Sequence, residues 1–74
     1  MNPAGTKEVQ IVVNGQLRNV PEDLSLAQVL NRLEVAPDRV AVELDGKLVR
    51  RQDWVGTPVA PGAVLEIVQF VGGG

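Results

Sequence analysis

The chain has 74 residues, enough for one compact domain, and 45% of them are apolar. Its formal charge of −2 comes without a basic stripe, which argues against nucleic-acid binding. Because it contains neither cysteine nor histidine, disulfides, the commonest metal ligands and Ser-His or Cys-His nucleophile systems are excluded. No apolar run approaches the ~20 residues of a membrane span, so we expect a soluble, cytoplasmic protein without membrane contact.

The first seven residues differ in pattern from the segment that follows them. Residues 1–7 contain proline and glycine and show no apolar period, so we expect a flexible leader. Residues 8–13 alternate and place three apolar side chains on one face, which predicts a half-buried strand carrying Val9, Ile11 and Val13.

A hairpin follows this strand. Asn14-Gly15 is the dipeptide favoured in two-residue type I′ turns, because both turn positions need a positive φ. Residues 16–20 then predict the returning strand, and Pro21 begins the polar segment that ends it.

A helix start signal comes next. Ser25 and Gln28 fit a capping box, in which the serine caps the helix and the glutamine reaches back. Helical spacing then predicts one apolar stripe, made of Leu26, Val29, Leu30 and Leu33. Because Pro37 prevents continuation, we expect the helix to end near residues 34–35.

The second half of the chain begins with another hairpin. Residues 40–44 are rich in valine and leucine and predict a third strand. Asp45-Gly46 is a second hairpin dipeptide, and residues 47–49 predict a short returning strand.

A helical turn and a last strand complete the pattern. Residues 50–55 are polar except for Trp54, and they predict a helical turn. We interpret Trp54 as closing the end of a small core rather than as a partner-binding anchor. Residues 63–71 carry apolar side chains on both faces, which predicts a central strand covered at least partly on each side.

The predicted order of elements, β-β-α-β-β-β, fixes the fold class. One helix cannot cover both faces of a sheet, so we expect an α+β domain with the helix on one face. The other face is then partly open and is a possible partner surface. This mixed sheet with a central C-terminal strand is the β-grasp arrangement of ubiquitin-like proteins. We place the domain at residues 8–71 and a flexible tail at residues 72–74.

The tail consists of Gly72, Gly73 and Gly74, which follow a strong strand directly. A frayed end would explain them. The alternative is a tail thin enough to enter a narrow channel, which carries an α-carboxylate up to ~10 Å beyond the folded body. That carboxylate is ionised and unreactive at neutral pH, so it must be activated, for example by adenylation. Such a carrier needs no catalytic side chain, and the carboxylate side chains of this chain suit turns and caps.

Several segments resemble the ThiS family of sulfur carrier proteins in thiamin biosynthesis. They are residues 40–49, Arg51 with Trp54, and residues 66–74 with their Phe-Val-Gly-Gly-Gly ending. The resemblance covers residues 9–74, with Arg50 at a position where family members often have proline. It implies a carrier rather than an enzyme, without catalytic residues, a bound metal or a cofactor of its own.

The resemblance also implies a mechanism and partners. A ThiF-like adenylyltransferase would use ATP to convert the Gly74 carboxylate to an acyl-adenylate. A sulfurtransferase or cysteine desulfurase system would then generate a thiocarboxylate, from which a ThiG-like thiazole synthase takes the sulfur. By position, Gly74 bears the sulfur, Gly72 and Gly73 thread into the partner's active site, and Phe70 and Val71 contact the partner.

Other functions share this fold. Carriers for molybdopterin synthesis (MoaD) end in a diglycine, but a proline-containing segment usually precedes it, and Gln69-Phe70-Val71 lacks one. Carriers for transfer-RNA thiolation are a second alternative. A TGS-like nucleic-acid-binding module belongs to another class; it would leave the glycines unused and would require a basic face.

Overall fold

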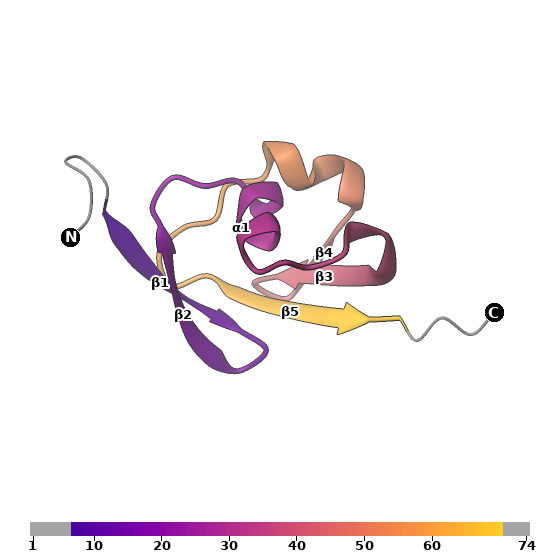
Figure 1. The fold of residues 1–74 in the computed structure, drawn as a ribbon, viewed down its shortest axis with the longest axis horizontal. Coiled ribbons are helices and arrows are strands. Elements are labelled where there is room, and N and C mark those ends of the chain that lie inside the picture. Colours follow the sequence, from indigo (N-terminus) through magenta and orange to yellow (C-terminus); the bar gives the residue numbers. More distant parts are fainter. Residues whose placement is uncertain (1–6, 71–74) are drawn as a thin grey trace.

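The structure is a computed structural model that describes residues 7–70, and it has the predicted order of strands and helix (Figure 1). The predicted leader, except Lys7, and the predicted tail with Val71 lie outside the described residues. The elements are β1 (Glu8–Val13), β2 (Gln16–Pro21), α1 (Leu26–Arg32), β3 (Val40–Leu44), β4 (Lys47–Val49) and β5 (Val64–Gln69), together with the 3₁₀ helices η1 (Pro37–Arg39) and η2 (Arg51–Gly56).

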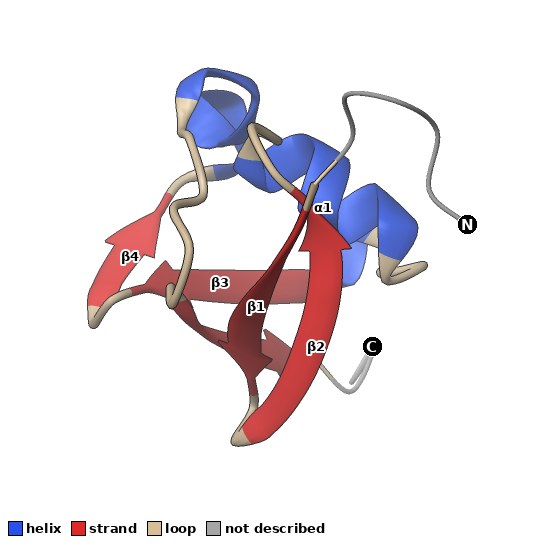
Figure 2. Cartoon of the chain, turned by 90° about the vertical axis from the view of Figure 1, so that its left-hand side faces the viewer, coloured by secondary structure: helices blue, strands red, loops and turns tan. Residues whose placement is uncertain are grey.

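The five strands form one mixed sheet in the order β2-β1-β5-β3-β4. The central strand, β5, runs parallel to β1 and antiparallel to β3. Figure 2 shows the helical segments gathered on one side of the sheet. The predicted α+β class and β-grasp arrangement, with the C-terminal strand in the middle, are therefore confirmed.

Both hairpin turns have the backbone that their sequences predict. Asn14 and Gly15 have φ values of 50° and 82°, and Asp45 and Gly46 have φ values of 51° and 84°. These positive values are the reason for the asparagine, aspartate and glycines, because most side chains disfavour this conformation.

The helix starts as predicted and ends earlier than predicted. The capping box is complete: the Gln28 amide donates to the Ser25 hydroxyl oxygen, and the Ser25 amide donates to the Gln28 side chain. The expected end near residues 34–35 is wrong, because α1 ends at Arg32. Glu34 takes a φ of 59°, and the amides of Glu34 and Val35 donate to the carbonyls of Asn31 and Leu30. This Schellman-type arrangement ends the helix before the chain reaches Pro37, which could not continue it.

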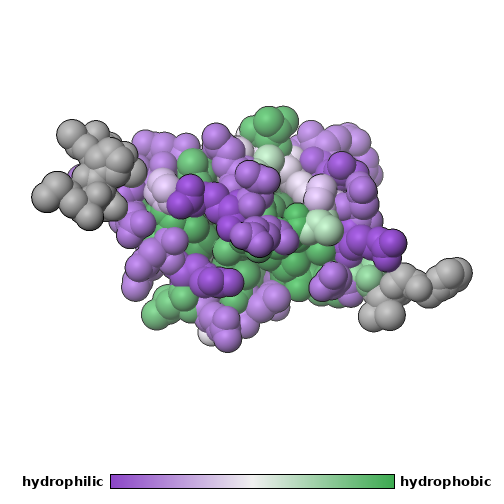
Figure 3. Space-filling view, viewed as in Figure 1, coloured by the Kyte–Doolittle hydropathy of each residue, from purple (hydrophilic) through white to green (hydrophobic). Residues whose placement is uncertain are grey.

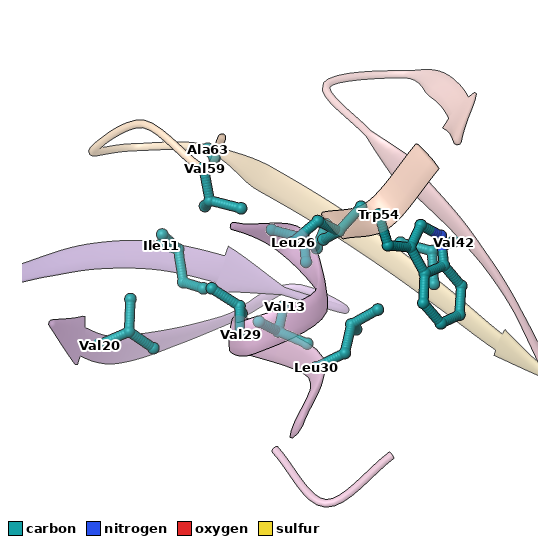
Figure 4. Packing of buried hydrophobic residues seen from close by; sticks show 11 residues of the cluster. Ile11, Val13, Val20, Leu26, Val29, Leu30, Val42, Trp54, Val59 and Ala63 are labelled. Atoms are coloured by element: carbon teal, nitrogen blue, oxygen red, sulfur yellow. The ribbon is translucent and has the colours of Figure 1, made fainter. Parts of the chain in front are cut away.

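The core lies between the helix and one face of the sheet. Figure 4 shows the packing of its buried side chains, Trp54 and Val42 among them. Trp54 is 5% exposed and its Nε1 donates to the Val49 carbonyl at 2.9 Å, which confirms its core role. Of the predicted helix stripe, three residues are buried and Leu33 is partly buried. The buried apolar residues are Ile11, Val13, Val20, Leu26, Val29, Leu30, Val42, Trp54, Val59, Ala63 and Leu65.

Candidate functional site

The described chain ends one residue beyond β5, so this strand is the base from which the glycine tail starts. Phe70 is held just beyond the sheet, since its amide donates to the carbonyl of Arg39, the last residue of η1, at 2.7 Å. Its side chain is 55% exposed. Phe70 is thus available for the predicted partner contact, whereas Val71 and the sulfur-carrying and threading glycines lie outside the described residues.

The two hairpin turns hold β5 from both sides. The Asn14 side chain accepts from the Ile67 amide at 2.7 Å and donates to the Ile67 carbonyl at 3.1 Å. The Asp45 side chain accepts from the Val64 amide at 2.9 Å, and the Asp45 amide donates to the Val64 carbonyl. The sequence predicts only a turn role for both residues. Each side chain bonds to a residue of β5 that is distant in the sequence, so no local sequence pattern indicates these contacts.

The two faces of β5 have different surroundings. Leu65 is fully buried and Ile67 packs against the core, both on the helix side. Val64 and Val68 point to the opposite side and are exposed. β5 is central, as predicted, and its second face is only partly covered, with Val64 41% and Val68 59% exposed. Apolar side chains on both faces of a strand do not tell how far each face is covered.

The sheet face opposite the helix, called the open face below, is largely apolar. Register places its members: residues paired across neighbouring strands point to the same side. Leu17, Leu48 and Val68 are each more than half exposed. Figure 3 shows hydrophobic surface between hydrophilic side chains in one view of the molecule. Around β5 the open face comprises Val12, Leu17, Ala41, Glu43, Leu48, Val64, Glu66 and Val68, and the alternation continues to Phe70. Gln10 and Asn19 add a polar pair farther along β1 and β2.

A groove of about 340 Å³ lies on the other side of β5, beside its end. The last turn of α1 and the segment after it form one wall, through Leu33 and Val35. Ile67 and Gln69 form the other, with Arg18 and Glu34 at the lining. The groove brings no set of reactive side chains together.

Within residues 7–70, the structure contains no group of three or more potential metal-ligating side chains and no buried charged side chain. Arg51, one of two adjacent arginines, forms an exposed ion pair with Asp38. In the same part of the chain, no helix has the length and apolarity that crossing a membrane requires. The candidate site within the described residues therefore consists of the open face and the anchored end of β5.

Comparison with known proteins identifies relatives across nearly the whole chain. The sequence model of the ThiS family matches residues 11–74. A crystal structure of the thiamine biosynthesis protein ThiS from Geobacter metallireducens is 35% identical, with a TM-score of 0.78 over 89% of this chain and 100% of that one. A solution structure of a thiamine biosynthesis protein from the same organism is 33% identical, with a TM-score of 0.73 over 89% of this chain and 88% of that one.

Two further relatives differ in length. The uncharacterized protein ycf40 of Porphyra purpurea is 34% identical over 68 residues, which cover 92% of this chain and 96% of that protein. A thiazole synthase of Paramagnetospirillum magneticum is 35% identical over 66 residues, or 89% of this chain. This region is only 20% of that synthase, so the chain spans a fifth of its length.

Proposed function

The chain belongs to the ThiS family, and from this premise we propose that it is a sulfur carrier whose working group is the carboxylate of Gly74. The observation that carries the proposal is the family match, which continues through residue 74 and so includes all three glycines. In this proposal the chain is a co-substrate rather than an enzyme, binds no cofactor itself and works in the cytoplasm.

The proposed chemistry proceeds in steps that take place on partner proteins. A ThiF-like adenylyltransferase joins the Gly74 carboxylate to the AMP part of ATP and releases pyrophosphate. The terminal sulfur of a persulfide, supplied by a sulfurtransferase or cysteine desulfurase system, attacks the acyl carbon and AMP leaves. A thiol then cleaves the resulting S–S bond, which leaves a thiocarboxylate on Gly74 and a disulfide on the donor side.

The anchored end of β5 suits this use. The two hairpins hold β5 through Ile67 and Val64, and the Arg39 carbonyl at the end of η1 holds Phe70, so the tail starts from a fixed point. The four residues from Val71 to Gly74 reach at most ~14 Å beyond Phe70. An enzyme that acts on Gly74 must therefore bind close to the end of β5, where fixed geometry helps to position the reacting group.

The acceptor that we propose is a ThiG-like thiazole synthase. The support is the thiazole synthase of Paramagnetospirillum magneticum, a fifth of which is similar to this chain. A carrier-like region and the synthase activity in one protein would keep donor and acceptor together at high effective concentration. This favours thiazole formation over the molybdopterin and transfer-RNA alternatives.

Intact-mass spectrometry tests the carrier function. We expect the protein, incubated with ATP, a ThiF-like adenylyltransferase and a persulfide donor, to gain the mass difference between sulfur and oxygen. Fragmentation should place the gain on Gly74. The starting mass must also correspond to a chain that ends at Gly74.

A chain that lacks Gly74 is the matched control. We expect it to keep its fold, because a terminal glycine has no side chain to pack and contributes little to stability. It should not yield a thiocarboxylate, since its carboxylate falls up to ~3.6 Å short of the activating group. Normal sulfur loading of this variant, or no loading of the full chain, would contradict the proposal.

A further inference from the structure

Two carboxylates face each other in the middle of the open face. Glu43 of β3 and Glu66 of β5 are direct partners in the antiparallel register, so their side chains lie side by side. Both are exposed. Like charges in directly opposed positions destabilise a sheet.

No basic side chain of the described chain forms an ion pair with either carboxylate. Arg50, which directly follows β4 and is exposed, lies by alternation on the same side as Leu48, but it too forms no ion pair with Glu43 or Glu66. The ion pair between Arg51 and Asp38 is the only one within residues 7–70. Lys47 and Arg18 are paired with Leu44 and Ile11, whose positions place them on the helix side of the sheet. The free protein therefore retains a repulsion between the two carboxylates that a cation from outside can relieve.

Apolar side chains surround the pair. Leu48 is the cross-strand neighbour of Glu43 on β4 and is 68% exposed. Val64 and Val68 flank Glu66 along β5 on the same face, and both are exposed. A protein surface that covered these side chains would exclude water from the carboxylates and strengthen any charge-assisted hydrogen bond to them.

The position of the two carboxylates indicates which partner protein covers the open face, and this step rests on the function proposed above. Val68 and Phe70 continue the same face from Glu66 toward the tail. Before sulfur is loaded, Gly74 carries a carboxylate like that of any chain terminus, and the glycines offer no side chain. The activating enzyme must therefore distinguish this carrier by its folded surface, and the nearest exposed apolar surface is the open face.

We propose that the open face binds the enzyme that activates Gly74, and that this enzyme inserts an arginine side chain between Glu43 and Glu66. A planar guanidinium presents several donors in a fixed fork and can bind two adjacent carboxylates together. It is also less strongly hydrated than an ammonium group, so it is better suited to an apolar surround. Binding relieves the repulsion and creates charge-assisted hydrogen bonds in one step.

The test measures pyrophosphate release by a ThiF-like adenylyltransferase as a function of carrier concentration. The variants are Glu43→Gln, Glu66→Gln and the double variant. We expect each single change to raise KM roughly tenfold with little change in kcat, since it removes binding rather than chemistry. The double variant should lose much less than the product of the single effects, because both carboxylates bind one group.

The matched control is Asp53→Asn, which removes the same charge from η2 on the helix side. It should leave KM unchanged. The KM difference between Glu66→Gln and the unmodified chain should shrink as salt concentration rises, because exposed charges are screened. Thermal melting of each variant tests the fold, and we expect none to melt below the unmodified chain.

A chain without Gly74 separates this proposal from the proposed function. It should inhibit activation of the full chain competitively, and adding Glu43→Gln and Glu66→Gln should abolish that inhibition. If the full chain is activated but the glutamine variants keep its KM, the docking proposal alone fails. It also fails if only transfer to the thiazole synthase is impaired, or if the changes abolish self-association instead. If the full chain is never activated, the carrier function itself fails.

Discussion

The helix-side face of β5 packs Leu65 and Ile67 against the core, whereas Val64 and Val68 on its other face remain in contact with solvent. These are the same kinds of side chain on the same six-residue strand. The difference shows that the role of an aliphatic residue in this strand depends on which face of the sheet its side chain points to. On one face they stabilise the domain, and on the other they form a surface beside the tail that a partner can cover.

The sharpest test of this division compares two identical changes on opposite faces. Leu65→Ala removes a fully buried side chain and should destabilise the protein by about 2–5 kcal/mol. Leu48→Ala, on the open face, should change stability by less than about 0.5 kcal/mol. Urea denaturation measures both free energies of unfolding. Similar costs for the two leucines would mean that the open face is covered in the free protein.

A second test addresses the anchors that fix β5 between its neighbours. Asn14→Ala removes two hydrogen bonds to Ile67 and places alanine at a positive φ, so it should cost about 1–3 kcal/mol. Asn14→Gly accepts the same φ and should cost less, which isolates the contribution of the side chain. Hydrogen exchange should quicken at the Ile67 amide in both variants.

The Val64 amide is the internal control for this experiment, because it is bound to Asp45 of the other hairpin. Its exchange should stay slow in both Asn14 variants. If Ile67 remains as protected as before, the asparagine is a turn residue only, as its sequence context indicates.

How far the sequence predicts the molecule follows from the range of each interaction. The hairpins at Asn14-Gly15 and Asp45-Gly46 depend on local backbone preferences, so the dipeptides predict them correctly. The capping box at Ser25 is equally local. The end of the helix is harder, because Pro37 sets only an outer limit and Glu34 adopts a positive φ without being glycine.

Long-range features of the site are not predictable in the same way. The bond from Asn14 to Ile67 and the pairing of Glu43 with Glu66 depend on which strands become neighbours. The alternation of side chains along β5 predicts that Glu66 and Leu65 point to opposite faces of the sheet. It does not identify the residue that pairs with Glu66 on the neighbouring strand. The function came from the glycine ending and the family resemblance, and Gly74 lies outside the described residues.

A third test removes an open-face side chain close to the tail. Phe70→Ala should weaken binding to the adenylyltransferase by roughly tenfold, because exposed aromatics next to a reactive tail are typical binding hot spots. Stability should change by less than about 0.5 kcal/mol. Val55→Ala is the control, since Val55 is 76% exposed but lies in η2 on the helix side. If Phe70→Ala and Val55→Ala weakened binding equally, the proposal that the enzyme binds the open face and not the helix side would be contradicted.

The smallest expected effect is also the most diagnostic, because stability and function should change in opposite directions. Glu66→Gln removes one of two opposed carboxylates and should stabilise the free protein by about 0.5 kcal/mol. The gain should shrink at high salt, since the repulsion between exposed charges is screened. The same variant should be the poorer substrate for activation. Changing a residue that stabilises the fold should destabilise the protein, whereas changing a residue that serves partner binding can stabilise it. If Glu66→Gln destabilises the chain at low salt, the carboxylate serves the sheet and not an external cation.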